Sequence, residues 1–177
     1  MRPVRLTVRQ IGALVAQRVK VGDVVEIPTS KGLAYAQCTH SIKQWGHLLR
    51  VLAGFHERRP QNFTPVVEAD ESFRTFFPLQ AAVSKGIFQV VANVAVPEDA
   101  IEFPLFRAAG HVDREGVVHN WFLWDGEKEW RVDGLTEEQF RLPLRQVVND
   151  TLLIERLEEG WTPYTDKRSR GKIEGAT

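Results

Sequence analysis

Two apolar runs meet at Asp125-Gly126, and this dipeptide constrains the fold of the chain more than any other feature. Aspartate followed by glycine readily adopts the positive φ angles of a two-residue type I′ turn, so residues 117–132 are predicted to form a β-hairpin. Opposed residue numbers in a hairpin have a constant sum, which makes Trp121 and Trp130 direct cross-strand neighbours. Such an aromatic pair stabilises a sheet by about 0.5 to 1 kcal/mol beyond burial.

A second hairpin is predicted near the N-terminus. Strand-forming residues 23–28 precede a turn-forming cluster, and a further strand is expected over 33–41. Small residues on one face of that strand leave room for a covering element, such as the amphipathic helix that a capping box predicts over 8–18. With a third strand expected over 47–55, the segment is predicted to form a curled sheet or an SH3-like barrel.

Prolines and glycines divide the middle of the chain. The polar segment 56–73 is expected to be a long loop, at which a subdivision of the domain is conceivable. A proline and a glycine bound a two-turn helix over 79–85. Alternation over 87–96 predicts a strand with its apolar residues on one face, and the acidic segment 97–104 is expected to be a loop.

Two capping signals predict helices near the C-terminus. Thr136 and Gln139 have the spacing of a capping box that begins one short helix. Asn149 is expected to cap a second helix that ends at Gly160. Its buried stripe comprises Leu153, Ile154 and Leu157, and its solvated face comprises Glu155, Arg156, Glu158 and Glu159.

These elements predict one α+β domain over residues 1–164, with curled antiparallel sheets covered by a few short helices, and a polar tail over 165–177. A chain of 177 residues can bury about 70% of its surface without a metal or disulfide. Cys38 is the single cysteine, so no internal disulfide is expected. Since neither a long apolar run nor a signal-peptide core is present, we expect a cytoplasmic protein without a membrane partner.

The sequence lacks the phosphate-binding, dinucleotide-binding, zinc-protease, serine-hydrolase and Cys-x-x-Cys motifs, so we predict no cofactor, metal or catalytic residue. Cys38 and His40 are predicted on one strand face, which is the minimum for a thiolate nucleophile, but burial as a small apolar residue is the favoured interpretation. A second cluster could bind zinc, although its spacing favours solvated turn charges. It comprises His111, Asp113, Glu115, His119 and Asp125.

Charge is balanced in total but not along the chain. Residues 1–66 carry 10 basic and 3 acidic side chains, whereas residues 67–139 carry 6 basic and 14 acidic ones. The basic part, with Arg50, Arg58 and Arg59, suggests nucleic-acid binding but lacks interleaved aromatic residues and a recognition helix. Two oppositely charged halves that fold against each other would explain the same asymmetry.

Several stretches resemble the immunity protein 26 family of bacterial polymorphic toxin systems. They are residues 21–28 with Tyr35, residues 77–79, and residues 149–156 with Gly160-Trp161. The resemblance implies a non-enzymatic cytosolic protein that binds and blocks a toxin by occlusion. Inhibitors of basic nuclease toxins are often acidic overall, whereas this chain is neutral, so only the acidic central segment could serve such a partner.

Within that segment, the sequence predicts a partner surface formed by Glu98, Asp99, Glu102, Trp124, Glu127 and Glu129. The hairpin arithmetic places Trp124 opposite Glu127 and nearer the surface than Trp121, which is expected in the core. Two alternatives stay open. One is a nucleic-acid-associated module that uses the basic first third, and the other is a small hydrolase with an unrecognised site.

Overall fold

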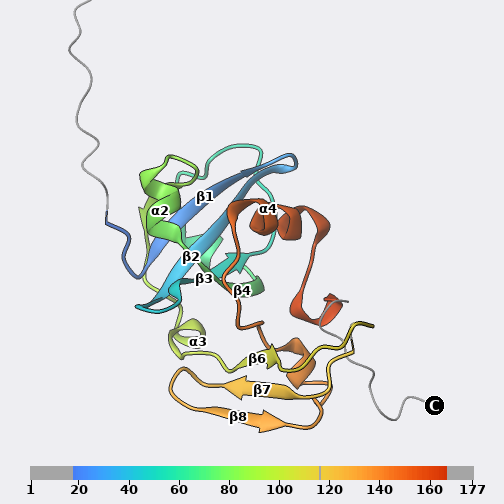
Figure 1. The fold of residues 1–177 in the computed structure, drawn as a ribbon. Coiled ribbons are helices and arrows are strands. Elements are labelled where there is room, and N and C mark those ends of the chain that lie inside the picture. Colours follow the sequence, from blue (N-terminus) through green and yellow to red (C-terminus); the bar gives the residue numbers. More distant parts are fainter. Residues whose placement is uncertain (1–17, 116, 167–177) are drawn as a thin grey trace, which may run out of the picture.

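A computed structural model describes residues 18–115 and 117–166 of the chain (Figure 1). The fold has two antiparallel sheets, and the larger one contains the predicted N-terminal hairpin. Its five strands follow the order β4-β3-β2-β1-β5. They are β1 Asp23–Thr29, β2 Gly32–Ile42, β3 Gly46–Leu52, β4 Glu71–Phe77 and β5 Gln89–Asn93. The expected SH3-like barrel is wrong, because β4 and β5 lie at opposite edges and the sheet stays open.

The smaller sheet has three strands in the order β6-β7-β8, and short helices complete an α+β fold as predicted. Its strands are β6 Phe106–Ala109, β7 Trp121–Trp124 and β8 Glu129–Val132. The helices are α1 Thr64–Val67, α2 Leu79–Ser84, α3 Glu98–Ile101 and α4 Asp150–Glu159, with 3-10 turns η1 Gln139–Arg141 and η2 Pro163–Thr165. In the described part of the chain, no helix has the length and apolar character needed to cross a bilayer.

Helices α2 and α4 cover one face of the larger sheet (Figure 1), where Ala34, Ala36 and Cys38 of β2 are buried. The sequence predicts an element that covers these small residues, and helices α2 and α4 cover them. The helix predicted over 8–18 lies outside the described residues, as does the tail after residue 166. The domain boundaries themselves remain a prediction.

Part of the segment 56–73 is not the loop that its polar composition predicts. It contains α1 and the start of β4, which pairs with β3. The Glu71 carboxylate accepts hydrogen bonds from Arg50 Nε at 3.2 Å and from Arg74 Nε at 2.9 Å. A strand whose polar residues are held by ion pairs looks like a loop when hydropathy alone is considered. In the same way, the expected loop 97–104 contains α3.

The alternating run that predicts β5 does not keep its apolar residues on one face. The pairing of β1 with β5 shifts between Val24 and Val25, so Val90 packs beneath α2 and α4 while Ala92 packs on the opposite face with Tyr35. A bulge of this kind exchanges the two faces of a strand. The strand also ends at Asn93, three residues earlier than expected.

The predicted hairpin is present, but its register is wrong. Strand β7 pairs with β8 so that Leu123 faces Trp130 and Trp124 faces Glu129. The connection has four residues, because the Asp125 carboxylate accepts backbone N–H groups from Glu127 at 2.9 Å and Lys128 at 2.7 Å. An aspartate that binds the backbone two and three residues ahead favours this longer turn over the two-residue turn.

Both capping predictions hold. Thr136 Oγ1 accepts from the Gln139 backbone N–H, and the Gln139 side chain accepts from the Thr136 backbone N–H at 2.9 Å. The helix that follows is only the 3-10 turn η1. Asn149 caps α4 by accepting from the Leu152 backbone N–H at 2.8 Å, and Gly160 ends the helix with φ of 63°.

The face of the larger sheet opposite α2 and α4 contains a buried carboxylate. Glu26 accepts a hydrogen bond from the Tyr35 hydroxyl at 3.0 Å and two from the Arg59 guanidinium at 2.8 and 2.7 Å. The Arg59 hydrogen bond lowers the Glu26 pKa below its ordinary value of 4.5, although burial acts in the opposite direction. Burial raises the pKa of the Tyr35 hydroxyl above its usual range.

We expect Glu26→Gln to lower the free energy of unfolding at pH 7 by about 1 to 3 kcal/mol, since it removes the charge-assisted bonds. A carboxylate whose pKa is lowered on folding stabilises the native state above its unfolded pKa and loses this effect as pH falls. The deficit of the variant should therefore shrink below pH 4.5. Urea denaturation across pH measures both effects. Glu57→Gln, at an exposed position, is the control, and a deficit independent of pH would contradict the assignment.

Candidate functional site

The structure brings the predicted acidic residues together at one end of the smaller sheet. Helix α3 lies near the turn between β7 and β8 (Figure 1). Phe103 joins the two, because its ring centroid lies 5.4 Å from that of Trp124 and a Cβ at Gly126 would come within 2.8 Å of the Phe103 ring. A side chain at Gly126, whose φ is 101°, would thus be excluded both by space and by backbone conformation.

Four carboxylates of this surface are exposed, namely Glu98, Asp99, Glu102 and Glu127. Among the described residues, none of the four forms an ion pair within 4.0 Å. We refer to these four carboxylates together with Ile101 as the acidic ridge. Ile101 is 58% exposed, the highest value among the large hydrophobic side chains that the structure describes, and sequence analysis missed it. Its position in a short segment with Glu98, Asp99 and Glu102 was the available signal.

The two other predicted members of the partner surface have internal roles. Trp124 is half-buried, and its ring packs against those of Phe76 and Phe106. Glu129 forms an ion pair with Arg145, whose guanidinium lies 5.6 Å from the centroid of the Trp124 ring. Trp124 thus supports the acidic ridge through Phe103, and Glu129 is exposed but already paired within the chain.

A second contact fixes α3 to the larger sheet. Nε2 of His40 lies 3.0 Å from the carbonyl oxygen of Ile101, and the His40 ring packs edge-on against Phe103. Burial lowers the His40 pKa from its ordinary value of 6.5. The acidic ridge is therefore held by packed aromatic rings and by a hydrogen bond between the larger sheet and α3.

Cys38 and His40 lie on different faces of β2. The β2–β3 register shifts between these residues, so Cys38 lies under α2 and α4 while the His40 ring contacts α3 and Phe103. The expectation that they share a face is wrong, and the bulge explains it. Burial raises the pKa of the Cys38 thiol to about 12, which leaves little thiolate at neutral pH.

Three of the five residues in the second cluster come together in a surface turn. Asp113 Oδ2 lies 2.8 Å from His119 Nε2, and the His111 and His119 ring centroids are 5.6 Å apart. The Val117 N–H and then His119 hold the Asp113 pKa below its usual range. Glu115 contributes only its backbone N–H to Asp113, and Asp125 lies in the other turn. Across residues 18–115 and 117–166, no three histidine, cysteine or acidic residues are grouped to hold a metal.

Two of the three arginines that suggested nucleic-acid binding have partners within the chain. Arg50 is 5% exposed and donates to the carbonyl oxygens of Val67 and Ala69, while Arg59 binds Glu26. Of the three arginines that suggested nucleic-acid binding, Arg58 alone has no internal contact in the described structure. Charge counted along the sequence therefore overstates the basic surface.

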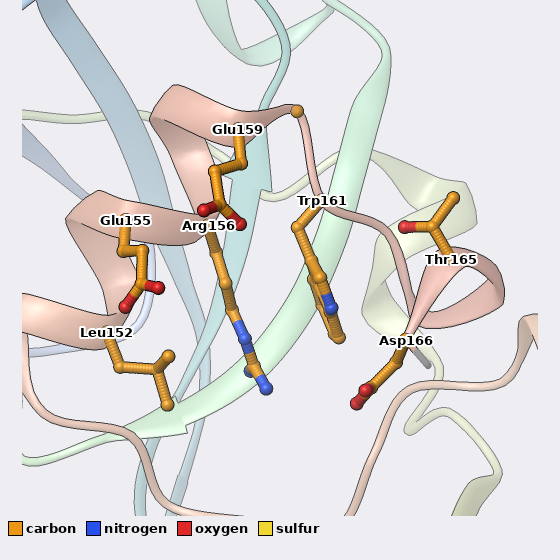
Figure 2. A pocket seen from close by; sticks show the side chains of 8 residues that line it. Leu152, Glu155, Arg156, Glu159, Trp161, Thr165 and Asp166 are labelled. Carbon is orange, nitrogen blue, oxygen red and sulfur yellow. The ribbon is translucent and has the colours of Figure 1, made fainter. Parts of the chain in front are cut away.

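The largest departure from the sequence analysis is Arg156. Figure 2 shows its guanidinium beside the Trp161 ring, in a cleft of about 350 Å³ between α4 and η2. The guanidinium carbon lies 3.8 Å from the ring centroid. With the Gln146 amide turned so that its oxygen faces the guanidinium, Gln146 accepts from both terminal nitrogens at 2.8 and 2.7 Å. Arg156 is 7% exposed, so its expected place on the solvated face is wrong. The missed signal was Trp161, which follows the Gly160 cap directly. The backbone N–H of Trp161 donates to the Arg156 carbonyl at 2.9 Å.

A second buried arginine lies close by. Arg107 of β6 is fully buried between the rings of Trp121 and Phe140, at 5.3 and 5.5 Å from their centroids. It donates to the carbonyl oxygen of Pro163 at 2.6 Å. Buried guanidinium groups are costly unless stacked and hydrogen-bonded, and both arginines meet these conditions. Their contacts indicate a structural role, fastening η2 and α4 to the smaller sheet.

Arg156→Ala should lower the free energy of unfolding by about 2 to 4 kcal/mol, because it removes the stacking on Trp161 and leaves Gln146 without its donors. Glu155→Ala, one residue away and exposed, should change it by less than about 0.5 kcal/mol. Chemical denaturation of both variants checks this. Equal, small effects would show that the arginine is dispensable for folding.

We expect Cys38 to resist an aromatic disulfide reagent at pH 8 in the native protein and to react fully in denaturant, because both burial and its raised pKa disfavour the exposed thiolate. The absorbance released by the reagent measures the fraction modified. Rapid, complete reaction without denaturant would contradict the assignment of Cys38 to the core.

Comparisons with protein-family models, with curated proteins and with solved structures each find no match to the chain. The surface of the chain itself, and above all the acidic ridge, therefore provides the evidence on function.

Proposed function

We propose that the chain is a non-enzymatic binding protein whose acidic ridge docks against a basic surface of another protein. The observation that carries this proposal is a 58% exposed isoleucine in one segment with three exposed carboxylates, near a fourth in the β7–β8 turn, and none of the four has an ion-pair partner among the described residues. An apolar centre rimmed by like charges is typical of an interaction surface. In line with the resemblance to immunity protein 26, the partner would be a toxin domain in the cytoplasm.

The two parts of the acidic ridge would act differently in binding. Ile101 would lose its exposed apolar surface to the partner, which contributes to affinity. The carboxylates would accelerate encounter with a basic surface and exclude acidic partners, an effect that weakens as salt rises. Binding by occlusion needs no bond-making step in this chain.

Rigidity supports the same function. Phe103 is fixed between Trp124 and Gly126, and the carbonyl of Ile101 is bonded to His40. A surface that is ordered before binding loses little conformational entropy on association. The acidic ridge therefore has the pre-organisation that tight inhibitors require.

The triple variant Glu98→Lys, Asp99→Lys, Glu102→Lys should slow association with a toxin domain encoded beside the chain's own gene by about tenfold or more at low salt. Surface plasmon resonance at several salt concentrations measures the rate. Ile101→Ser should instead increase the dissociation rate, because it removes apolar contact.

The matched control applies the same charge change near α1, as Glu57→Lys, Glu68→Lys, Asp70→Lys, at three exposed positions. It should leave the association rate within about twofold of the parent protein. If control and test variants slow association equally, net charge rather than the acidic ridge governs encounter. Unchanged binding by the test variant would overturn the proposal.

A further inference from the structure

We propose that β8 is a self-complementary edge through which two copies of the chain associate, joining their smaller sheets into one six-stranded antiparallel sheet. In the part of the chain that the structure describes, β8 is an edge strand of the smaller sheet: it pairs with β7 on one side, and no strand pairs with it on the other. Edge strands present unpaired N–H and C=O groups to a second strand. This inference is independent of the proposed function, since it rests on the edge strand β8 and not on the acidic ridge.

The hydrogen-bond pattern shows which backbone groups of β8 point outward. Antiparallel pairs alternate between hydrogen-bonded and non-hydrogen-bonded residues. The Asp125 N–H donates to the Lys128 carbonyl at 3.2 Å, so the residue pair two positions further along, Leu123 and Trp130, is also hydrogen-bonded. The backbone groups of Glu129 and Arg131 therefore point away from β7.

The other side of β7 gives the same assignment. The Gly110 N–H donates to the Asn120 carbonyl at 2.8 Å, which makes Phe122 and Trp124 the residues that bond β6. Their neighbours in β7 must then bond β8. Two independent hydrogen bonds thus agree on the outward groups of the edge.

Charge selects one register among those that this alternation allows. An antiparallel pair of identical strands can be centred on residue 129, 130 or 131. Centring on Glu129 or on Arg131 would place that residue opposite its own copy, whereas centring on Trp130 places each Glu129 opposite an Arg131. Within β8, this register alone avoids like charges in direct opposition. It also brings each Arg131 beside a Glu129 of the other copy, and this carboxylate, which pairs with Arg145 in its own chain and is 41% exposed, can accept from a second guanidinium. The strand is therefore complementary to a second copy of itself.

Trp130 strengthens the same register. It is 41% exposed although it belongs to a strand, and its own backbone groups bond β7. At the centre of the proposed pair, the two Trp130 residues would occupy a non-hydrogen-bonded position, where opposing side chains come closest. An exposed aromatic ring would thus be covered by its symmetry mate.

The charged residues of β8 also have an opposite interpretation, because charges on an edge strand discourage pairing. Two features favour association. Arg131 is 63% exposed and its ion pair with Asp133 is long, at 3.5 Å, so it is available to a second partner. The order Glu129, Trp130, Arg131 places like charges opposite each other only when two copies pair in a register other than the one centred on Trp130. A four-residue strand gives a small interface, so we expect dimerisation that depends on concentration.

Sedimentation velocity of the intact chain tests the proposal. The mass should rise from 20.2 kDa towards twice that value as concentration increases. Arg131→Glu and Glu129→Arg should each weaken self-association by about tenfold or more, since each places like charges in opposition twice. Arg114→Glu, the same charge change at an exposed turn, is the control and should dimerise like the parent.

Mixing the two single variants gives the decisive result. In a mixed dimer every opposed pair is again of opposite charge, so an equimolar mixture should regain the parent's self-association although neither variant alone does. Circular dichroism confirms that each variant is folded. A parent chain that stays monomeric at all concentrations would overturn the proposal and leave β8 to an extended segment of another protein. Dimers that persist in Arg131→Glu, or a mixture that does not recover, would place the contact on another surface.

Discussion

The packing of Phe76 against Phe106 holds the two sheets together, and the positions of all the surface features depend on it. The rings stack with centroids 5.0 Å apart, and both side chains are fully buried. A sheet of three four-residue strands has little stability on its own. By joining β4 to β6, this contact gives the smaller sheet a share of the larger sheet's core, and the acidic ridge inherits that rigidity through Phe103.

Buried guanidinium groups perform the same function further from the centre. Arg107 and Arg156 fasten η2 and α4 through stacked rings and carbonyl or amide oxygens. Flexible aliphatic side chains would fill the volume but would not fix an orientation, whereas a planar guanidinium stacks and donates in defined directions. The short, irregular connections around the smaller sheet are therefore ordered by polar contacts within an aromatic environment.

Local signals predicted the elements of this fold well, and non-local pairing explains what they missed. The capping residues at Thr136 and Asn149 act within four residues, so sequence alone identified them. The bulge in the β1–β5 pairing and the ion pair of Glu71 with Arg50 depend on segments far away in the chain, and the burial of Arg156 depends on Gln146 and Trp161, which lie outside its helix. For the candidate site, the carboxylates were predicted, but the exposure of Ile101 and the internal role of Glu129 became evident only from the fold.

The neutral net charge of the chain conceals this arrangement. Positive and negative side chains are equal in number, yet Arg50, Arg107 and Arg156 are buried within the fold, whereas the carboxylates of the acidic ridge face solvent. The buried cations lie farther from an approaching protein than the exposed carboxylates do, and the interaction between two charges weakens with distance and with screening by salt. A chain of zero net charge can therefore present a locally acidic surface. The neutral composition, which seemed to weaken the case for a basic partner, does not count against one.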